Sequence, residues 1–509
     1  MAVVFASLSE TGVLNAAAIP ILVLGAAILY FLVRCLYNLF WQPLAKIPGP
    51  KLYAISPIPY FYHLLRGDWH ATLKQLHDRY GPVVRFAPTD VSFITAEAFK
   101  AIYGHKTAGS GTRTFEKDEL FYKDRRPHAT IFNSNNEDHR RMRRLLAHAF
   151  SEKALHSQED IMNHYVNKFI EKLTEQAAQG KAIDMTSWFN FATFDLIGDL
   201  AFGEPFGCLD SGGYHPWVRL IFQSTKVTAY RFIAQRLGIG HLLAHLLPKK
   251  TSMAFQEHRQ LSHNTALARI ATDTKRPDFM SYILRHNDDK GMTQGEILEL
   301  SDGLIVAGSE TTATLLSGTT YFLLINRAKY DKLVDEIRSE FNSEDEITIA
   351  RVNQLSYTVA VLNEGLRMYP PVPIGLPRKV PMNGEVVQGY WLPEKTGVSV
   401  PHWSAYRSDT NFLEPGSFIP ERWLGDPRFA SDNKAVLQPF SMGPRNCIGK
   451  NLAYAESRLL LVRLLWKFDL ELMDSSKRWD SQQTYVLWDK SSLDVKLTAV
   501  NGDKEISTC

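Results

Sequence analysis

Residues 440–449 read FSMGPRNCIG and contain Cys447, one of four cysteines in a chain of 509 residues. A helix-like run follows at once, so Cys447 lies just before a predicted helix N-terminus. The partial positive charge of that terminus and the full charge of Arg445 are expected to lower the thiol pKa and favour the thiolate, the form that binds metals. Gly443 and Gly449 permit a tight turn and the close approach of a flat group. The alternative is a buried, inert cysteine, which is the commoner state of a cysteine considered alone.

The spacing of this stretch resembles the haem-binding loop of the cytochrome P-450 monooxygenases: Phe, two residues, Gly, one residue, Arg, one residue, Cys, one residue, Gly. The resemblance implies that Cys447 is the axial thiolate ligand of haem b, whose electron donation promotes O–O bond cleavage. It also implies that Phe440 packs near the cysteine and that Arg445 contacts a haem propionate, with Gly443 and Gly449 in the same haem-binding loop. The implied fold is mainly α with small β-sheets, and the haem lies between a long central helix and the cysteine loop.

Two further stretches resemble parts of that family that contact the haem propionates. Residues 136–144 resemble its propionate helix, where the usual pattern is Trp, three residues, Arg. This chain keeps Arg143 but has His139 in the Trp place, and an imidazole can still donate one hydrogen bond. Arg378 follows a proline-rich run and resembles another propionate-binding arginine. The remaining arginines of the basic run form either a solvated face or a surface that steers an acidic reductase domain: Arg140, Arg141 and Arg144.

Residues 293–327 predict one long helix. Thr293 and Glu296 form a capping-box pattern at its start, and its almost uncharged middle indicates a path through the centre of the domain. Residues 307–312 read AGSETT, and these poor helix formers can bend a helix or bond its carbonyl groups. Considered alone, the stretch predicts a helix-packing motif with one satisfied acid.

Together with the cysteine loop, the same stretch resembles the oxygen-binding groove of the family. Thr311 then matches the alcohol that hydrogen-bonds dioxygen, and Glu310 matches the acid that relays protons. Ala307 is the small residue that leaves room above the iron.

Other elements follow from helical periodicity and from short extended runs. Glu364 and Arg367 lie three residues apart, which alone predicts a surface pair. With Arg422 they resemble the buried Glu–Arg–Arg triad of the family, whose role is structural. Further helices are predicted at 138–150, 157–175, 328–341, 357–368 and 452–468, and extended segments at 83–86, 91–95 and 386–391.

The N-terminal region predicts a membrane anchor. Residues 12–33 carry no charge and would extend about 30 Å as a helix, enough to cross a bilayer. No Lys or Arg precedes the run, and it is longer than the apolar core of a signal peptide, the alternative interpretation. Basic residues follow the run, which places the body of the protein in the cytosol. The expected organisation is a lumenal segment 1–11, an anchor 12–33, a proline-rich hinge 34–50 and one haem-thiolate monooxygenase domain 51–509.

Composition excludes several other classes of protein. The 57 Lys and Arg residues against 54 Asp and Glu give a net charge of +3, which argues against a nucleic-acid binder. The four scattered cysteines indicate no disulfide framework. His241 and His245 have a spacing that can hold zinc, but no third ligand is evident. Their Leu-rich neighbours favour a membrane-facing or access-channel segment.

The resemblance implies a single-pass enzyme of the endoplasmic reticulum membrane that inserts one oxygen atom from O₂ into a lipophilic small molecule. No Gly-x-Gly-x-x-Gly fingerprint occurs, so electrons are expected from NADPH through a separate flavoprotein reductase. The chain resembles fungal enzymes of secondary-metabolite, mycotoxin-like biosynthesis, which predicts a terpenoid or polyketide intermediate as substrate. Specificity is expected in the loops 108–133 and 225–250.

Three alternatives differ in testable ways. A haem-thiolate isomerase or dehydratase would commonly lack the acid–alcohol pair that Glu310 and Thr311 supply here. A non-catalytic haem-binding protein, such as a gas sensor, would consume no NADPH. A membrane-anchored structural protein would bind no haem.

Overall fold

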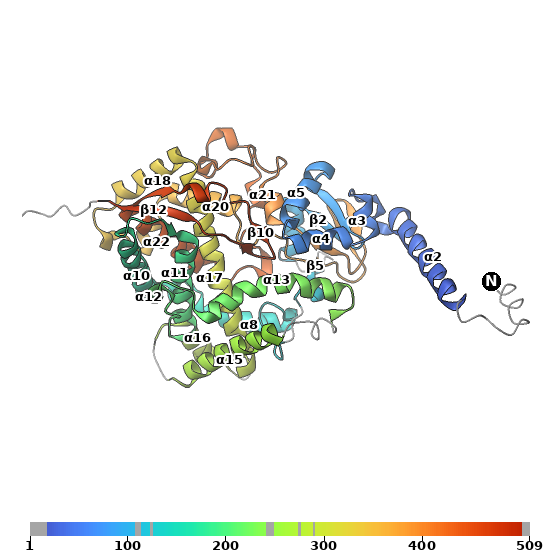
Figure 1. The fold of residues 1–509 in the computed structure, drawn as a ribbon, viewed down its shortest axis with the longest axis horizontal. Coiled ribbons are helices and arrows are strands. Elements are labelled where there is room, and N and C mark those ends of the chain that lie inside the picture. Colours follow the sequence, from blue (N-terminus) through green and yellow to red (C-terminus); the bar gives the residue numbers. More distant parts are fainter. Residues whose placement is uncertain are drawn as a thin grey trace, which may run out of the picture.

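The body of the chain is mainly helical, with small β-sheets at its edges, as predicted (Figure 1). The computed structural model describes residues 18–106, 113–122, 126–240, 249–272, 276–288 and 291–500. Its helices are α2 (Ala18–Phe40), α3 (Lys51–Ile55), α4 (Ile58–Arg66), α5 (Trp69–Tyr80), α6 (Ala96–Tyr103), α7 (Glu119–Tyr122), α8 (Asn136–Ala149), α9 (Glu152–Ser157), α10 (Glu159–Ala177), α11 (Met185–Phe202), α12 (Cys208–Ser211), α13 (Pro216–Arg236), α15 (Lys249–Ala271), α16 (Phe279–His286), α17 (Gln294–Leu324), α18 (Arg327–Glu340), α19 (Ile349–Val352), α20 (Ser356–Met368), α21 (His402–Tyr406) and α22 (Lys450–Lys467). The helices predicted by periodicity are confirmed, with ends displaced by a few residues.

The long helix α17 passes through the middle of the body and packs along α11 and α20 (Figure 1). Its predicted capping box is present: the Thr293 hydroxyl accepts from the Glu296 backbone N–H, and the Glu296 carboxylate accepts from the Thr293 backbone N–H. A cap of this kind satisfies amide groups that no helical carbonyl can reach. Most of α17 is buried, so its polar side chains must find partners inside the protein.

The strands form one larger sheet and three small ones. The larger sheet has the order β1 (Val83–Ala87), β2 (Asp90–Phe93), β8 (Gly397–Ser399), β5 (Arg378–Lys379) and β3 (Glu116–Lys117), and β2 and β8 are parallel. A second sheet has the order β4 (Ile183–Asp184), β12 (Asp494–Ala499) and β9 (Phe468–Leu472). The remaining two are hairpins: β6 (Glu385–Val387) with β7 (Tyr390–Leu392), and β10 (Gln483–Thr484) with β11 (Trp488–Asp489).

One strand prediction is confirmed only in part. The extended segment expected at 386–391 is the hairpin β6–β7, in which Val387 pairs with Tyr390. Gln388 and Gly389 both have positive φ, 52° and 77°, as the tightest hairpin turns require. Gly389 is a turn signal that the sequence prediction did not use, whereas Gln388 is a weak one.

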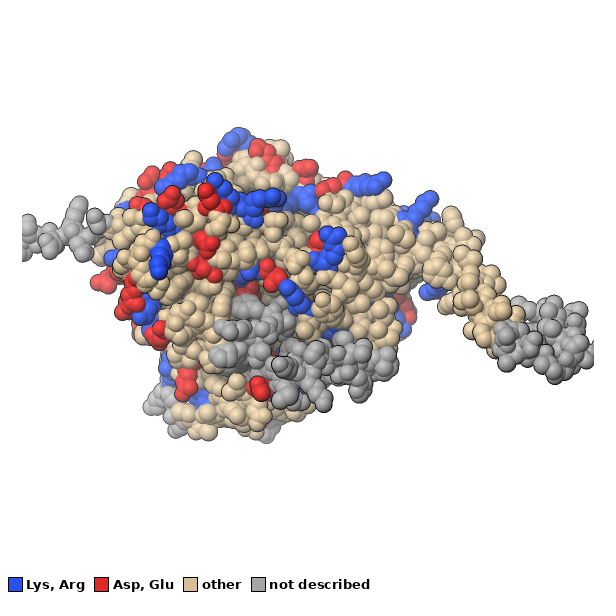
Figure 2. Space-filling view, viewed as in Figure 1, with Lys and Arg blue, Asp and Glu red and all other residues tan. Residues whose placement is uncertain are grey.

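The N-terminal helix α2 projects from the body (Figure 1). Residues Ile19–Phe40 are long and apolar enough to cross a membrane, with a mean hydropathy of 2.3. The helix continues past the predicted end at 33, while residues 12–17 of the predicted anchor and the segment 1–11 lie outside the described residues. Figure 2 shows the projecting helix as an almost uncharged surface, with basic side chains close to the body.

The predicted proline-rich hinge is tied to the body by a buried arginine. Arg85, on β1, is 2% exposed and donates hydrogen bonds to the carbonyl oxygens of Asn38 at 2.8 Å and Pro88 at 2.9 Å, and to the side chain of Gln42. Asn38 belongs to α2, and Gln42 follows its end. The junction is therefore held by specific bonds in addition to its prolines.

The predicted triad is present and fully buried. Arg367 Nη2 lies 2.7 Å from Glu364 Oε1, and Arg422 Nε lies 3.2 Å from the same oxygen. Trp423 donates to the other carboxylate oxygen, and Asp432, which the sequence did not indicate, pairs with Arg422. Although burial raises the pKa of Glu364, the two arginines lower it overall. The cluster balances two cations with two anions.

Removal of one charge from this cluster is expected to destabilise the fold. Glu364→Gln leaves two buried guanidinium groups short of one anion, and breaking a buried pair in this way typically costs about 3–5 kcal/mol. Arg428→Gln, which removes an exposed ion pair with Asp426, is the control and should leave stability unchanged. Thermal unfolding followed by circular dichroism gives the comparison, and equal midpoints for the two variants would contradict a structural role for the triad.

Candidate active site

The cysteine loop is closed by its own backbone. The Cys447 N–H donates to the Phe440 carbonyl oxygen at 2.8 Å, and residues Gly443–Arg445 form a short 3-10 turn just before it. Gly443 has φ 72°, and a Cβ there would lie 2.0 Å from the carbonyl oxygen of Tyr103. The loop therefore requires glycine at this position, as the sequence predicted.

The electrostatics of the Cys447 thiol differ from the prediction. The side chain is accessible, yet enough protein surrounds it that burial raises its pKa, against smaller opposing effects of the Gly449 backbone and of Arg143. The expected lowering of the thiol pKa is wrong for the thiol by itself. The cations that act on the thiol are Arg143 and Lys450, whereas the Arg445 guanidinium donates to the Ser134 carbonyl at 2.8 Å.

Arg143 occupies the place expected of Arg445. Its guanidinium donates to both oxygens of Asn446, the residue before the cysteine, with 2.6 Å to the carbonyl oxygen. Arg143 lies on α8, so these bonds fix the cysteine loop against that helix. The sequence indicated both arginines but could not tell which one approaches the thiol.

Basic side chains from four segments converge near this loop. They are Lys117 on β3, His139 and Arg143 on α8, Arg378 on β5, and Arg445. Burial and then Arg445 and Lys117 lower the pKa of His139 to about 3, and burial followed by Arg378 lowers the pKa of Arg445 to about 10. The pKa of Lys117 falls for the same reasons. These shifts arise because the groups lie close together: Lys117, Arg143, Arg378 and Arg445 surround a neutral His139, and the five residues are called the cationic cluster below. Lys117 is a member that sequence reasoning missed.

Two hydrogen-bond donors of the cationic cluster lack an acceptor among the described residues. Arg445 Nη1 and Arg378 Nε are buried and have no hydrogen-bond partner within the described part of the chain. An unpaired buried donor costs free energy, and a gathering of cations favours an anion among them. These residues fit a ligand that carries two carboxylates close to a thiolate-bound metal, which is the chemistry of haem.

The segment 307–312 of α17 uses its hydroxyl groups within the helix. Thr311 Oγ1 donates to the Ala307 carbonyl at 2.6 Å, so carbonyl bonding, one of the two predicted roles, is confirmed, and the α-helix is unbroken here. A Cβ on Gly308 would meet the Ile197 side chain at 2.6 Å, so glycine allows the close packing of α17 on α11. Glu310 is 2% exposed, and its Oε1 lies 2.5 Å from Lys490 Nζ.

Comparison with known proteins decides the family. The family model described as Cytochrome P450 matches residues 50–497. This chain belongs to the cytochrome P450 family.

Relatives cover nearly the whole of this P450. The cytochrome P450 monooxygenase astA of Talaromyces wortmannii is 46% identical over 483 residues, covering 94% of this chain and 97% of the relative. The cytochrome P450 monooxygenase aclL of Aspergillus oryzae is 43% identical over 480 residues, with 94% and 98% covered. The cytochrome P450 monooxygenase lcsI of Purpureocillium lilacinum is 44% identical over 485 residues, with 93% of each chain covered.

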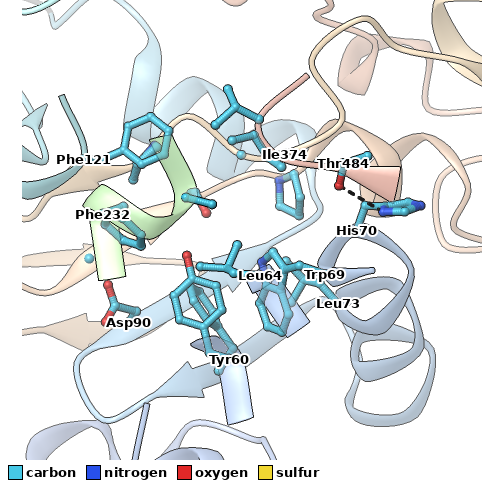
Figure 3. A pocket seen from close by; sticks show the side chains of 18 of the residues that line it. Tyr60, Leu64, Trp69, His70, Leu73, Asp90, Phe121, Phe232, Ile374 and Thr484 are labelled. Atoms are coloured by element: carbon cyan, nitrogen blue, oxygen red, sulfur yellow. Dashed lines mark hydrogen bonds between the residues drawn. The ribbon is translucent and has the colours of Figure 1, made fainter. Parts of the chain in front are cut away.

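A pocket with aromatic walls lies between α4, α5, α13 and the β10–β11 hairpin of this P450 (Figure 3). Tyr60, Trp69 and Phe232 face the pocket, and His70 bonds Thr484 at 3.1 Å on its far side (Figure 3). Part of the lining, including Phe121 and Phe232, comes from the two loops predicted to control specificity. No lining residue belongs to the cysteine loop or to residues 307–312. His241 and His245 lie outside the described residues.

The structure brings together the residues predicted to hold the propionates. The two residues of the predicted proton relay have different partners. His139, Arg143, Arg378 and Arg445 share the cationic cluster with Lys117. Glu310 and Thr311, adjacent in sequence, bond different partners: Lys490 for the acid, the helix carbonyl for the alcohol. Lys490 was missed because no local pattern marks a single lysine in a C-terminal hairpin.

Proposed function

We propose that this cytochrome P450 is a haem-thiolate monooxygenase that inserts one oxygen atom of O₂ into a lipophilic small molecule and reduces the other to water. The observation that carries the proposal is the closed cysteine loop beside a cationic cluster. Haem bound there would supply oxygen activation, and the Cys447 thiolate would hold its iron. His139, Arg143, Arg378 and Arg445, together with Lys117, would hold the propionates.

The thiolate assignment has a direct spectroscopic test. Cys447→Ser should lose the strongly red-shifted absorption band of the reduced, carbon-monoxide-treated enzyme, because an alcohol does not replace the thiolate as a donor. Cys35→Ser, in α2 and far along the chain from the loop, is the matched control and should keep the band. An intact band in the Cys447 variant would refute the assignment, and no haem in the wild-type protein would favour the structural alternative.

Thr311 and Glu310 are proposed to deliver protons rather than to bind haem. The hydroxyl of Thr311 can rotate from the Ala307 carbonyl to hold a water or a reacting oxygen, while Glu310 is a buried acid one residue away. Positioned proton transfer of this kind is worth about 10²–10⁴ in rate. Since Ala307 has only a methyl side chain, it leaves space beside the hydroxyl.

Loss of the Thr311 hydroxyl should divert electrons from product. Thr311→Ala is expected to keep the haem spectrum but to form less product for each NADPH consumed, with hydrogen peroxide accounting for the difference. Thr311→Ser keeps a hydroxyl and should stay near the wild-type ratio. If the alanine variant also keeps the wild-type ratio, the relay is wrong and a peroxide-rearranging isomerase becomes the better proposal.

The proposed electron donor is a separate NADPH-dependent flavoprotein reductase. Of the three arginines considered for docking, Arg141 is already engaged: it bonds Glu296 at 2.7 Å and Asp138 at 2.8 Å. Arg140 and Arg144 are exposed, one turn apart on α8, and can attract an acidic partner, although Arg144 also lies 3.6 Å from the exposed Asp288. Charge reversal of both should slow electron transfer at low salt, and an unchanged rate would restore the solvated-face interpretation.

We place the protein in the endoplasmic reticulum membrane, anchored by α2 with its body in the cytosol. The apolar helix and the basic residues that follow it support this orientation. Protease added to sealed microsomes should digest the body, and protection of the body would refute the topology.

The proposed substrate is a terpenoid or polyketide intermediate of fungal secondary metabolism. The relatives named above are cytochrome P450 monooxygenases from filamentous fungi, which supports this class of substrate. Incubation of the reductase-coupled enzyme with a panel of such metabolites identifies the substrate and the oxidised position, and oxidation of no member would contradict the class.

A further inference from the structure

Lys490 connects the C-terminal hairpin to the middle of α17. It follows β11 directly, and its Nζ lies 2.5 Å from Glu310 Oε1 and 2.6 Å from Thr314 Oγ1. The side chains of Lys490 and Glu310 are 3% and 2% exposed. This pair is therefore removed from solvent, unlike the ion pairs on the protein surface.

The two carboxylate oxygens of Glu310 have different surroundings. Oε1 accepts from Lys490 and, at 3.2 Å, from Thr314. Oε2 is buried and has no hydrogen-bond partner among the described residues. Oε1 is therefore fixed by its hydrogen bonds, whereas Oε2 has a free lone pair that can accept a proton.

The charge of Glu310 depends on Lys490. The other titratable groups that act on the pair are Tyr214, which precedes α13, Tyr369, which follows α20, and Asp184 on β4. Burial raises the pKa of both tyrosines, so they stay neutral. Burial lowers the pKa of Lys490, and Glu310 and, to a smaller extent, Asp184 oppose that effect. Burial also raises the pKa of Glu310, and Lys490 is the chief opposing influence.

The hairpin does not need Lys490 to stay in place. Trp488 Nε1 donates to the Pro370 carbonyl at 2.8 Å, and its ring stacks on Tyr369 with centroids 4.4 Å apart. On the other side, Asp489 pairs with Lys226 of α13 at 2.8 Å. A buried lysine beside a hairpin that is already held points to a role for its charge.

We propose that Lys490 is a positioning residue for proton delivery: it keeps Glu310 ionised and holds Oε1, so that Oε2 is the oxygen that takes up and releases protons. This inference rests on the proposed role of Glu310 as the acid of the relay. It adds to that role a specific counter-ion, contributed by a part of the chain remote from α17.

The test is an infrared titration of the full-length ferric holoenzyme. The carboxylic-acid band of Glu310 is assigned by its absence in Glu310→Gln. In Lys490→Met the band should appear at a pH about 1–3 units higher than in the wild type, since an adjacent opposite charge shifts a carboxyl pKa by that amount. Lys490→Arg, which keeps the charge, should titrate near the wild type. An unchanged titration in Lys490→Met overturns the proposal.

If Lys490→Met folds poorly, a double variant shows whether Lys490 acts through Glu310 or through packing. The double variant Lys490→Met/Glu310→Gln removes both charges, so recovery of haem binding and of the unfolding midpoint in the double variant shows that the lysine acts through the acid. Equal instability of the single and double variants shows that it acts through packing, and overturns the proposal.

The relay itself is measured separately. If Glu310→Gln keeps the wild-type ratio of product to NADPH, the role of Glu310 in proton delivery fails. The infrared shift would still report whether Lys490 controls the charge of that acid, so the two failures are distinguishable.

Discussion

Every acidic side chain of α17 forms an ion pair with a cation from another part of the chain. This helix runs through the interior, where an unpaired charge is costly. Its acids are each matched, in the order Glu296 with Arg141, Glu299 with Arg259, Asp302 with Arg126, and Glu310 with Lys490. The partners come from α8, from α15, from the segment before α8 and from the C-terminal hairpin. The burial of α17 therefore depends on cations from four other segments of the chain, each of which packs against it.

The cysteine loop shows the opposite balance. Around it cations gather, and the described residues offer few acids in return, with Glu116 a minor influence on Arg445. Since every acid of α17 is paired with a cation, the lack of acidic partners for these cations is significant. The contrast separates charges that hold the fold together from charges that await a ligand. It supports the proposal that the cluster binds the haem carboxylates.

The features that could be predicted from the sequence are those that depend on local patterns. Contacts between residues distant in sequence could not be predicted. The spacing around Cys447 and the capping box at Thr293 are visible within ten residues, so both could be identified. That Arg143 rather than Arg445 acts on the thiol depends on how α8 packs against the loop, which no spacing encodes. The pairing of Lys490 with Glu310 joins residues 180 positions apart. The turn of the β6–β7 hairpin was missed although Gly389 marks it locally, because Gln388 beside it is a residue type that rarely adopts a positive φ.

The bonds of Arg85 have a consequence for the orientation of the whole enzyme. The guanidinium joins the last turn of α2 to β1, and burial lowers its pKa only to about 10, so it stays charged. Any swing of the anchor relative to the larger sheet would leave a buried cation without its acceptors. The angle between helix and sheet is therefore a property of the polypeptide. When α2 tilts to match the thickness of a bilayer, the domain therefore tilts with it, and so do α4 and α5, which wall the aromatic pocket.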